Sequence, residues 1–331
     1  MKAMVLERPL LVEQSPLVLR EIRDPSPAAG QVRIRVKCCG LCHTDLHTIE
    51  GEIKLPKLPI VLGHQIVGLV DEVGAGVCNF RMGDRVGIPW LHSTDQSCEY
   101  CTRGFENLCL NAQFTGLHVD GGYAEYTVVS EQYAYAIPPA FSDENAAPLL
   151  CAGIIGYRSY RLSGAGKGDR LGLYGFGASA HLVLQFARLL GCEVSVFTRA
   201  KAHRELALEL GASWVGSAEE IPPKLLDAAI IFAPAGSLVP LALRALRKAG
   251  TLTLAGITMS PIPQMPYDLL YDERVIRSVA NSTRQDAREF LDLAAKVPLR
   301  TEVQVYDLSH GNEALQALKH SEIKGAGVLR I

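Results

Sequence analysis

The sequence predicts an α/β protein of two domains, with a β domain at the N-terminus and a doubly wound parallel α/β domain after it. The chain has 331 residues, which exceeds the size at which a single core usually divides. The first 150 residues consist of short β-rich runs separated by glycine and proline turns. From about residue 170, apolar strands alternate with helices, as parallel β-α-β units do.

The N-terminal part shows the patterns of half-buried strands. "VRIRV" (32–36) alternates with period two, and "IVGLVDEVG" (66–74) and "YAEYTVVS" (123–130) are further β-rich runs. Helical periodicity is scarce until residues 142–162, where Ser142 is a suitable cap for a helix with acidic residues in its first turn.

The second half predicts a regular alternation of elements. We expect strands at 170–175, 193–198, 226–233 and 251–257, and helices at 178–191, 202–211 and 237–250. The tail predicts a helix at 285–296, a strand at 302–306, a helix at 311–319 and a terminal strand "GVLRI". We therefore expect a first domain at 1–151, a dinucleotide-binding domain at 152–284, and a return of 285–331 to the first domain.

Composition excludes several classes of partner. The net charge of −2 provides no electrostatic attraction for nucleic acid or an anionic membrane. Charges at positions 2, 7, 8 and 13 interrupt any signal-peptide core, and the longest uncharged run, 249–267, is broken by glycines and prolines. We expect a cytoplasmic protein.

The cysteine content points to metal binding or catalysis. Nine cysteines in a cytoplasmic chain indicate these uses rather than disulfides. We interpret Cys38, Cys39, Cys78 and Cys192 as buried small residues.

A glycine turn predicts a dinucleotide site. Gly175-x-Gly177-x-x-Ala180 follows the first strand of the α/β half and opens its first helix. The first glycine makes the turn, the second admits a pyrophosphate, and the small third residue lets helix and strand pack closely. The helix N-terminus favours the phosphate charge. The alternative is a glycine-rich turn that only packs against the sheet.

The end of the next strand favours NADP over NAD. An acidic residue there would bind the ribose hydroxyls of NAD, but this chain has Thr198, followed by Arg199 and, a turn later, Arg204. Guanidinium groups suit a 2′-phosphate. Alternatively, the arginines are solvated and the enzyme takes NAD with modest selectivity.

Two groups of cysteine and histidine predict metal sites. Cys42, His64 and Cys151 are far apart in sequence, yet two thiolates and one imidazole make an open zinc site with a fourth position for water or substrate. In "STDQSCEYCTRGFENLC" (93–109), Cys98, Cys101 and Cys109 have metal-ligand spacing, and Asp95 stands where a fourth ligand would complete the set. The alternative is a loop that holds no metal.

These motifs together resemble the zinc-dependent alcohol dehydrogenases of the medium-chain dehydrogenase/reductase superfamily. The matching stretches run in the family's order from about residue 30 to the C-terminus: "GLCHTDLH", "GHQIVGLVDEVG", "GDRVGI", the cysteine-rich loop, "DGGYAEY", "APLLCAG" and the Gly175 turn. "YGFGASAH" resembles the bacterial branch near the cinnamyl-alcohol-type dehydrogenases. The resemblance implies a GroES-like first domain, a Rossmann second domain, and hydride transfer between a primary or secondary alcohol and a nicotinamide dinucleotide.

The resemblance also implies roles for single residues. Cys42, His64 and Cys151 would bind the catalytic zinc, with Asp45 orienting His64. Thr44 would hydrogen-bond the substrate oxygen, and His47 would pass the proton on to solvent. His43 would touch the cofactor phosphate, Arg284 would bind the pyrophosphate, and Trp90 would form a wall of the substrate pocket. Each of these last three has a plain alternative, as an exposed histidine, a surface arginine and a core tryptophan.

Two positions depart from the family pattern. Gln65 stands where an acidic residue is usual behind the metal, so we expect a functional but altered site. Asp95 replaces the first of four cysteines that hold a structural zinc. An ionised carboxylate matches the charge of a thiolate but binds zinc less tightly. We predict a structural zinc bound by Asp95, Cys98, Cys101 and Cys109; the competing outcome is a loop that kept its cysteines and lost the metal.

Two other functions would fit parts of this pattern. A zinc-independent quinone or enone reductase of the same superfamily would lack the set Cys42, His64 and Cys151, and a zinc-stabilised binding module without activity would leave the Gly175 turn idle. We therefore expect an enzyme that acts on a small alcohol or aldehyde, without nucleic acid or membrane as partner. By analogy with the family it would be a homodimer or homotetramer.

Overall fold

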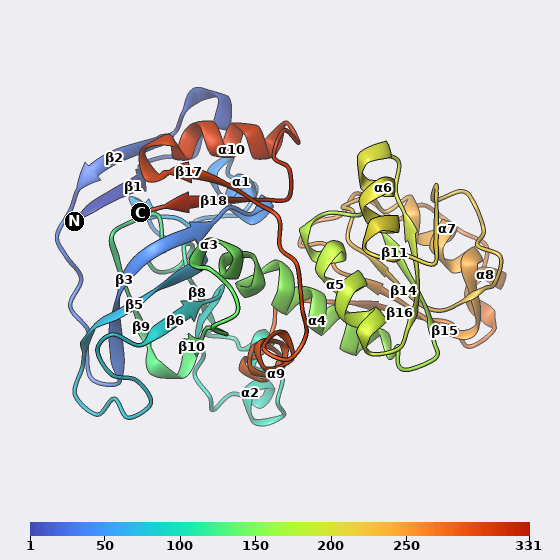
Figure 1. Ribbon diagram of the computed structural model, residues 1–331, viewed down its shortest axis with the longest axis horizontal. Coiled ribbons are helices and arrows are strands. Elements are labelled where there is room, and N and C mark those ends of the chain that lie inside the picture. Colours follow the sequence, from blue (N-terminus) through green and yellow to red (C-terminus); the bar gives the residue numbers. More distant parts are fainter. The chain divides into compact units, whose positions relative to one another are not determined.

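The computed structural model describes residues 1–331, which divide into two compact units. The first unit contains Met1–Cys151, Ser282–Lys296 and Thr301–Ile331, and the second contains Ala152–Asn281 and Val297–Arg300. Figure 1 shows the C-terminal segment returning to lie beside the N-terminal strands of the first unit. The return begins at residue 282, three residues before the boundary that the sequence suggested.

The strands of the first unit are β1 (Lys2–Leu6), β2 (Leu17–Glu21), β3 (Gln31–Gly40), β4 (Ile60–Val61), β5 (Gln65–Val73), β6 (Arg85–Ile88), β7 (Leu91–Ser93), β8 (Gln113–Phe114), β9 (Tyr126–Ser130), β10 (Tyr135–Ala136), β17 (Val303–Asp307) and β18 (Ala326–Arg330). Its α-helices are α1 (His43–Ile49), α2 (Glu99–Thr102), α3 (Asp143–Ala146), α9 (Arg284–Ala294) and α10 (Gly311–Lys319).

The strands of the second unit are β11 (Arg170–Tyr174), β12 (Glu193–Phe197), β13 (Trp214–Gly216), β14 (Leu226–Ile231), β15 (Leu246–Leu254) and β16 (Val275–Ser278). Its α-helices are α4 (Ala152–Ser163), α5 (Ala178–Leu189), α6 (Lys201–Glu209), α7 (Leu238–Ala245) and α8 (Asp268–Tyr271).

Strand β3 organises the first unit. It pairs with β5 along most of its length, with β9 beside its first half and with β18 beside its end, all antiparallel. The sheet has the order β10-β6-β5-β3-β18-β17, and a smaller sheet has the order β2-β1-β4. Because β18 comes from the C-terminus, residues at both ends of the chain share one apolar core, which includes Met4, Ile34 and Leu329.

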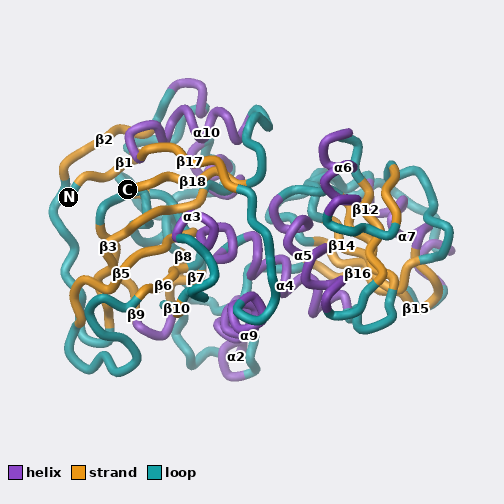
Figure 2. The backbone as a smooth tube through the Cα atoms, in the orientation of Figure 1, coloured by secondary structure: helices purple, strands orange, loops and turns teal.

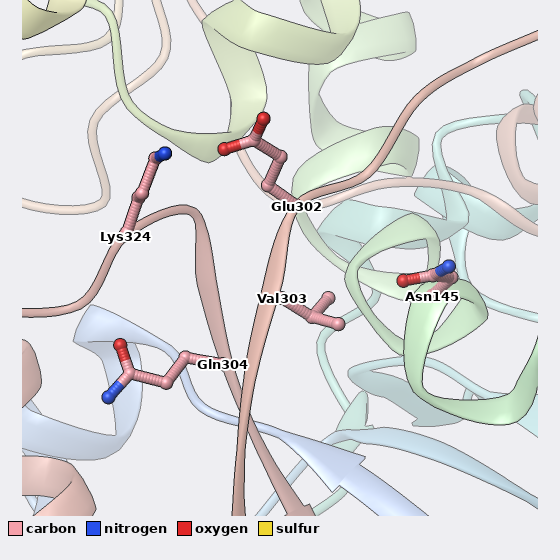
Figure 3. A pocket seen from close by; sticks show the side chains of 5 residues that line it. All are labelled: Asn145, Glu302, Val303, Gln304 and Lys324. Carbon is pink, nitrogen blue, oxygen red and sulfur yellow. The ribbon is translucent and has the colours of Figure 1, made fainter.

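The second unit is a parallel sheet in the order β13-β12-β11-β14-β15-β16. The order reverses direction at β11, as in a doubly wound fold, and the ligand crevice of such sheets lies at the carboxyl ends of the strands at that point. The rings of Tyr174 and Phe197, at the ends of the two strands β11 and β12, stack with centroids 4.0 Å apart. Figure 2 shows these strands with the helices and loops that connect them.

Two predicted helices are shorter in the structure. The helix predicted over 142–162 is interrupted: Ser142 caps the short α3, a 3-10 turn at Ala147–Leu150 contains Pro148, and α4 begins only at Ala152. The helix predicted over 237–250 ends at Ala245, because Leu246 pairs with Leu226 and begins β15.

The prediction that four cysteines are buried small residues is confirmed for three of them and wrong for one. Cys38, Cys39 and Cys192 are buried, whereas Cys78 is exposed in the loop between β5 and β6, with its Sγ 3.4 Å from the carbonyl oxygen of Gly76. None of the helices combines the length and the apolar character that crossing a membrane requires.

Candidate active site and metal centres

Three residues that are distant in sequence form one cluster in the first unit. Cys42 ends the turn after β3, His64 lies between β4 and β5, and Cys151 lies between the 3-10 turn and α4. Their ligand atoms lie within 4.8 Å of one another, and the two Sγ atoms are 3.8 Å apart. Cys151 has φ −125° and ψ −71°, so the interruption of the predicted helix falls at the residue that supplies the thiol.

Cys42 is held at the start of α1 by its own side chain. Its Sγ accepts the backbone N–H of Thr44 at 3.5 Å, and the Asp45 carboxylate accepts the backbone N–H of Cys42 at 2.9 Å, which completes a capping box. A hydrogen bond from the Cys151 thiol lowers the pKa of Cys42, and the same hydrogen bond, together with burial, raises the pKa of Cys151. A helix N-terminus also favours a thiolate.

His64 presents an unpaired nitrogen to this cluster. Its side chain is 2% exposed, and Nδ1 lies 3.4 Å from a carboxylate oxygen of Asp45. Nε2 is buried and has no hydrogen-bond partner. A buried unpaired nitrogen is costly unless a ligand satisfies it, and zinc-bound histidines generally donate the other nitrogen to a carboxylate. The donor set of two sulfurs and one nitrogen therefore fits a zinc ion with an open fourth position.

The residues predicted to handle the substrate and its proton lie along α1. The Thr44 hydroxyl is 3.5 Å from Cys42 Sγ, beside the cluster. His47 lies one turn further along, and its Nδ1 is 2.6 Å from an oxygen of Glu52, which is exposed. His43 is exposed, and its predicted contact with cofactor phosphate stays a prediction.

Trp90 lies beside the same cluster. Its ring centroid is 6.0 Å from that of His64, and it stacks on Phe114 at 4.5 Å with an angle of 26° between the planes. Trp90 and Phe114 are both partly exposed. The two rings make a rigid apolar surface next to the metal ligands, which is the kind of surface that lines small-molecule sites.

Gln65 supports the loop that carries Cys42. Its side chain is 3% exposed, and Nε2 donates a hydrogen bond to the carbonyl oxygen of Leu41 at 3.0 Å. A Cβ at Gly40 would lie 3.0 Å from this side chain, so glutamine and glycine fit closely together. A carboxylate in this place would have no proton to donate to Leu41.

A second cluster lies in the loop between β7 and β8. Ligand atoms of Asp95, Cys98, Cys101 and Cys109 all lie within 4.8 Å of one another. One Asp95 oxygen accepts the backbone N–H groups of Ser97 and Cys98, at 3.0 and 2.9 Å, and the other accepts the Asn111 amide at 2.8 Å. The N–H of Cys98 and then that of Ser97 hold the pKa of Asp95 well below its usual range.

Backbone amides also point at the sulfurs of this loop. Cys109 Sγ accepts the N–H groups of Asp95 and Asn111, both at 3.4 Å. A hydrogen bond from the backbone of Cys101 and another from Leu110 lower the pKa of Cys98. Amides placed in this way stabilise thiolates, which are the form that binds zinc.

The predicted dinucleotide turn has the expected shape in the second unit. Gly175 has φ +86°, which favours glycine, and a Cβ there would lie 3.1 Å from Ala233. Gly177 caps α5 and has open space where a Cβ would stand, while Ala180 is fully buried. The chain's own packing does not require glycine at 177, whereas a pyrophosphate approaching the backbone would.

The residues after β12 differ in their burial and in their hydrogen bonds. Thr198 is 8% exposed, and its carbonyl oxygen accepts a hydrogen bond from Arg204 Nε at 2.9 Å. Arg204 therefore satisfies the carbonyl that follows the last residue of β12. Arg199 and His203 are exposed, so their side chains face solvent at the place where the cofactor ribose is expected.

Arg284 is committed to contacts inside the first unit. Its guanidinium forms an ion pair with Glu106 at 2.7 Å, donates to Gln132 at 2.8 Å and stacks over the ring of Tyr133. Its backbone N–H also donates to Glu106 at 2.6 Å. These contacts fix the start of α9 against the cysteine-rich loop, and the expected role of Arg284 in binding pyrophosphate stays a prediction.

Comparisons with known proteins agree with this arrangement. Residues 28–139 match the family "Alcohol dehydrogenase GroES-like domain", and residues 180–296 match "Zinc-binding dehydrogenase". The probable alcohol dehydrogenase AdhA of Mycobacterium tuberculosis (strain CDC 1551 / Oshkosh) is 46% identical over 337 residues, which cover 100% of this chain and 97% of the relative.

Solved structures show the same likeness. An NAD-dependent alcohol dehydrogenase superposes with a TM-score of 0.91 and 26% identity over 100% of both chains. CAD from Helicobacter pylori complexed with NADP(H) superposes with a TM-score of 0.86 and 26% identity, over 100% of this chain and 99% of that one.

The chain belongs to the family of zinc-binding alcohol dehydrogenases. It is an oxidoreductase that interconverts alcohols with aldehydes or ketones, with zinc and a nicotinamide dinucleotide as cofactors. The predictions of a GroES-like domain and a Rossmann-type domain are confirmed. Nothing in these comparisons favours a zinc-independent reductase or a binding module.

Sequence reasoning missed several residues that the structure brings to these sites. Glu52 contacts His47, Phe114 stacks on Trp90, Tyr123 donates to Asp45, and Asn111 donates to Asp95. Glu52 lies only five positions after His47, so a search for acidic neighbours would have found it. Phe114 carries no comparable signal. Tyr123 lies in the family-like stretch "DGGYAEY", but its partner Asp45 depends on the folding of distant segments.

We expect Gln65→Glu to lower the free energy of unfolding by about 1–3 kcal/mol, because the carbonyl of Leu41 would lose its donor and face a charge. We also expect a changed kcat and zinc affinity, since a negative charge would be added next to His64. Urea unfolding and steady-state kinetics measure the two effects. Gln65→Met, which removes the donor without adding charge, separates them. Unchanged kinetics and zinc affinity in Gln65→Glu would contradict this account.

Proposed function

We propose that Cys42, His64 and Cys151 hold the catalytic zinc of this alcohol dehydrogenase. The observation that carries the proposal is the unpaired, buried Nε2 of His64 beside two sulfurs that are 3.8 Å apart. When bound, zinc would act as a Lewis acid on the substrate oxygen, and the nicotinamide would accept or donate the hydride. Substrates are primary or secondary alcohols and the corresponding aldehydes or ketones.

The residues of α1 would manage the proton of the substrate hydroxyl. Thr44 lies beside the metal ligands and would form a hydrogen bond with the substrate oxygen. His47 would carry the released proton toward solvent, with Nδ1 held against the exposed Glu52. Trp90, stacked on Phe114, would form an apolar wall that orients the substrate and excludes water.

The purified protein should oxidise alcohols and reduce aldehydes with NADP(H) or NAD(H), and a chelator should abolish the activity until zinc is restored. Cys151→Ser should bind one zinc ion fewer per chain and lose about 100-fold or more in kcat, because a metal ligand is removed. Cys192→Ser, a buried cysteine outside both clusters, is the matched control and should retain activity. Activity that survives chelation would point instead to a zinc-independent reductase.

We also propose that the loop of Asp95, Cys98, Cys101 and Cys109 binds a structural zinc. The four ligand atoms are already gathered, and amides stabilise the charged forms of Asp95 and Cys98. The three hydrogen bonds to Asp95 leave one lone pair of its carboxylate for a metal, on the oxygen that accepts only the Asn111 amide. An oxygen ligand binds zinc less tightly than a fourth thiolate would.

Metal analysis tests this second site directly. Wild-type protein should contain two zinc ions per chain, and Asp95→Ala should contain one. Asp95→Cys should hold the second ion with a dissociation constant at least about tenfold lower, because sulfur replaces oxygen. Glu99→Ala changes an exposed acid in the same loop and should leave the content at two. A wild-type content of one, unchanged in Asp95→Ala, would show a loop without metal.

The exposed Arg199 supports a preference for NADP. Thr198 carries no charge to repel a 2′-phosphate, and the side chain of Arg199 next to it faces solvent. Arg204 adds positive charge nearby but is tied to the Thr198 carbonyl. We therefore assign phosphate recognition chiefly to Arg199.

Replacing Arg199 by serine should weaken NADPH binding about tenfold, which is the expected effect of losing one charge-assisted hydrogen bond. NADH binding should change little, because NADH lacks the 2′-phosphate. Cofactor fluorescence titrations measure both dissociation constants. Arg244→Ser, at an exposed position of α7, controls for the loss of one positive charge. Equal effects of Arg199→Ser on NADPH and NADH would overturn the assignment.

The expected homodimer or homotetramer stays a prediction. Strand β16 is an edge of the six-stranded sheet, and Tyr267, Tyr271 and Val275 are large exposed side chains at or near it. An edge strand with apolar neighbours can pair with a second copy across a twofold axis, and sedimentation equilibrium measures the assembly.

A further inference from the structure

Tyr123 is a buried residue whose hydroxyl faces the carboxylate that supports the metal ligands. Its side chain has no exposed surface, and its hydroxyl donates a hydrogen bond to Asp45 Oδ2 at 3.0 Å. Burial, followed by the neighbouring Asp45 charge, raises the pKa of Tyr123 well above its usual value. The phenol therefore stays protonated, and remains a hydrogen-bond donor, at neutral pH.

The backbone around Tyr123 is tied to the segment that leads into His64. The N–H groups of Gly121, Gly122 and Tyr123 donate to the carbonyls of Val61, Gly63 and Leu62, at 2.8 to 2.9 Å. On its other side, the Tyr123 carbonyl accepts the N–H of Met4 at 2.8 Å. The position of the phenol is thus fixed relative to the histidine ligand.

The ring has no room to move away. A Cβ on Gly63 would lie 2.4 Å from Tyr123 Cδ1 and 2.8 Å from Cys39 Sγ, so the ring packs directly on the glycine backbone. Gly63 has φ +92°, which also favours glycine. This close packing keeps the hydroxyl within hydrogen-bond distance of Asp45.

The Asp45 carboxylate contacts both a cysteine ligand, Cys42, and the histidine ligand, His64. Asp45 Oδ2 accepts the backbone N–H of Cys42 at 2.9 Å as well as the Tyr123 hydroxyl, and Oδ1 faces His64 Nδ1 at 3.4 Å. Asp45 is 2% exposed, so water is not available to replace a lost donor. Hydrogen bonds to a buried charge are among the stronger ones in proteins.

We propose that Tyr123 is a positioning residue for the catalytic zinc, which orients the Asp45 carboxylate and through it His64 and Cys42. The inference rests on the proposed function, in which His64 and Cys42 bind the metal. Without the phenol, Asp45 would keep only the Cys42 amide and the His64 ring as donors and would rotate toward one of them. The two ligands would then be held less well for the same ion.

The test is the affinity of the catalytic zinc ion in Tyr123→Phe, which removes the hydroxyl and keeps the ring. Zinc transfer from the metal-loaded protein to a chromogenic chelator of known affinity reports both ions, and the ion missing in Cys151→Ser is the catalytic one. Tyr123→Phe should raise the dissociation constant of that ion about tenfold, as loss of a supporting hydrogen bond around a zinc site does, and leave the other ion unchanged. The matched control, Tyr133→Phe, loses a hydrogen bond to Thr94 of similar length and should not affect the catalytic ion.

A double-mutant cycle separates positioning from a general structural role. In Asp45→Asn, the added Tyr123→Phe change should alter the zinc dissociation constant by less than about threefold, because the phenol no longer acts on a charge. Unchanged zinc affinity in Tyr123→Phe, or fully multiplicative effects of the two changes, would overturn the proposal. If Cys151→Ser loses no zinc relative to wild type, the assignment of the catalytic site fails instead, and the two failures are distinct.

Discussion

The arrangement of the catalytic region depends on the contacts of one carboxylate, that of Asp45, with Cys42, His64 and Tyr123. It closes the capping box that starts α1, and this fixes Cys42. It also faces the Nδ1 of His64, so that Nε2 points at the two sulfurs. A buried carboxylate is tolerated only when donors compensate its charge, and here the donors belong to the proposed metal ligands and to Tyr123. The negative charge of Asp45, which positions Cys42 and His64, is therefore stabilised by hydrogen-bond donors that belong to the same site.

The two proposed metal sites are built on different physical principles. Asp95 and its three cysteines lie within one loop, and backbone amides of the same loop prepare their charged forms. Cys42, His64 and Cys151 come from three segments, which only the completed fold of the first unit brings together. Loss of packing would therefore separate the proposed catalytic ligands first. The cysteine-rich loop would retain much of its geometry, because its contacts are local.

The arginines show how a charged side chain can be committed to structure or left for a ligand. Arg284 uses its guanidinium on Glu106 and Gln132, and Arg204 uses its Nε on the Thr198 carbonyl. Arg199 faces solvent. All three were expected to bind the cofactor, yet their surroundings differ. Residue type and spacing identify where positive charge is available, and the neighbouring acceptors decide whether it remains available.

The sequence by itself determined the fold class, the glycine turn and the candidate ligands of the cysteine-rich loop, because periodicity and ligand spacing are local patterns with specific chemical meaning. The candidate set of Cys42, His64 and Cys151 followed from the combination of motifs along the chain and their resemblance to a family. Only the tertiary structure decided the surroundings of those residues. Gln65 donates to a carbonyl 24 positions away, Tyr123 to a carboxylate 78 positions away, and Arg284 pairs with an acid 178 positions away. The break before Cys151 likewise places its thiol 3.8 Å from that of Cys42, which is 109 positions away. Such contacts arise from the packing of distant segments, which no local pattern records.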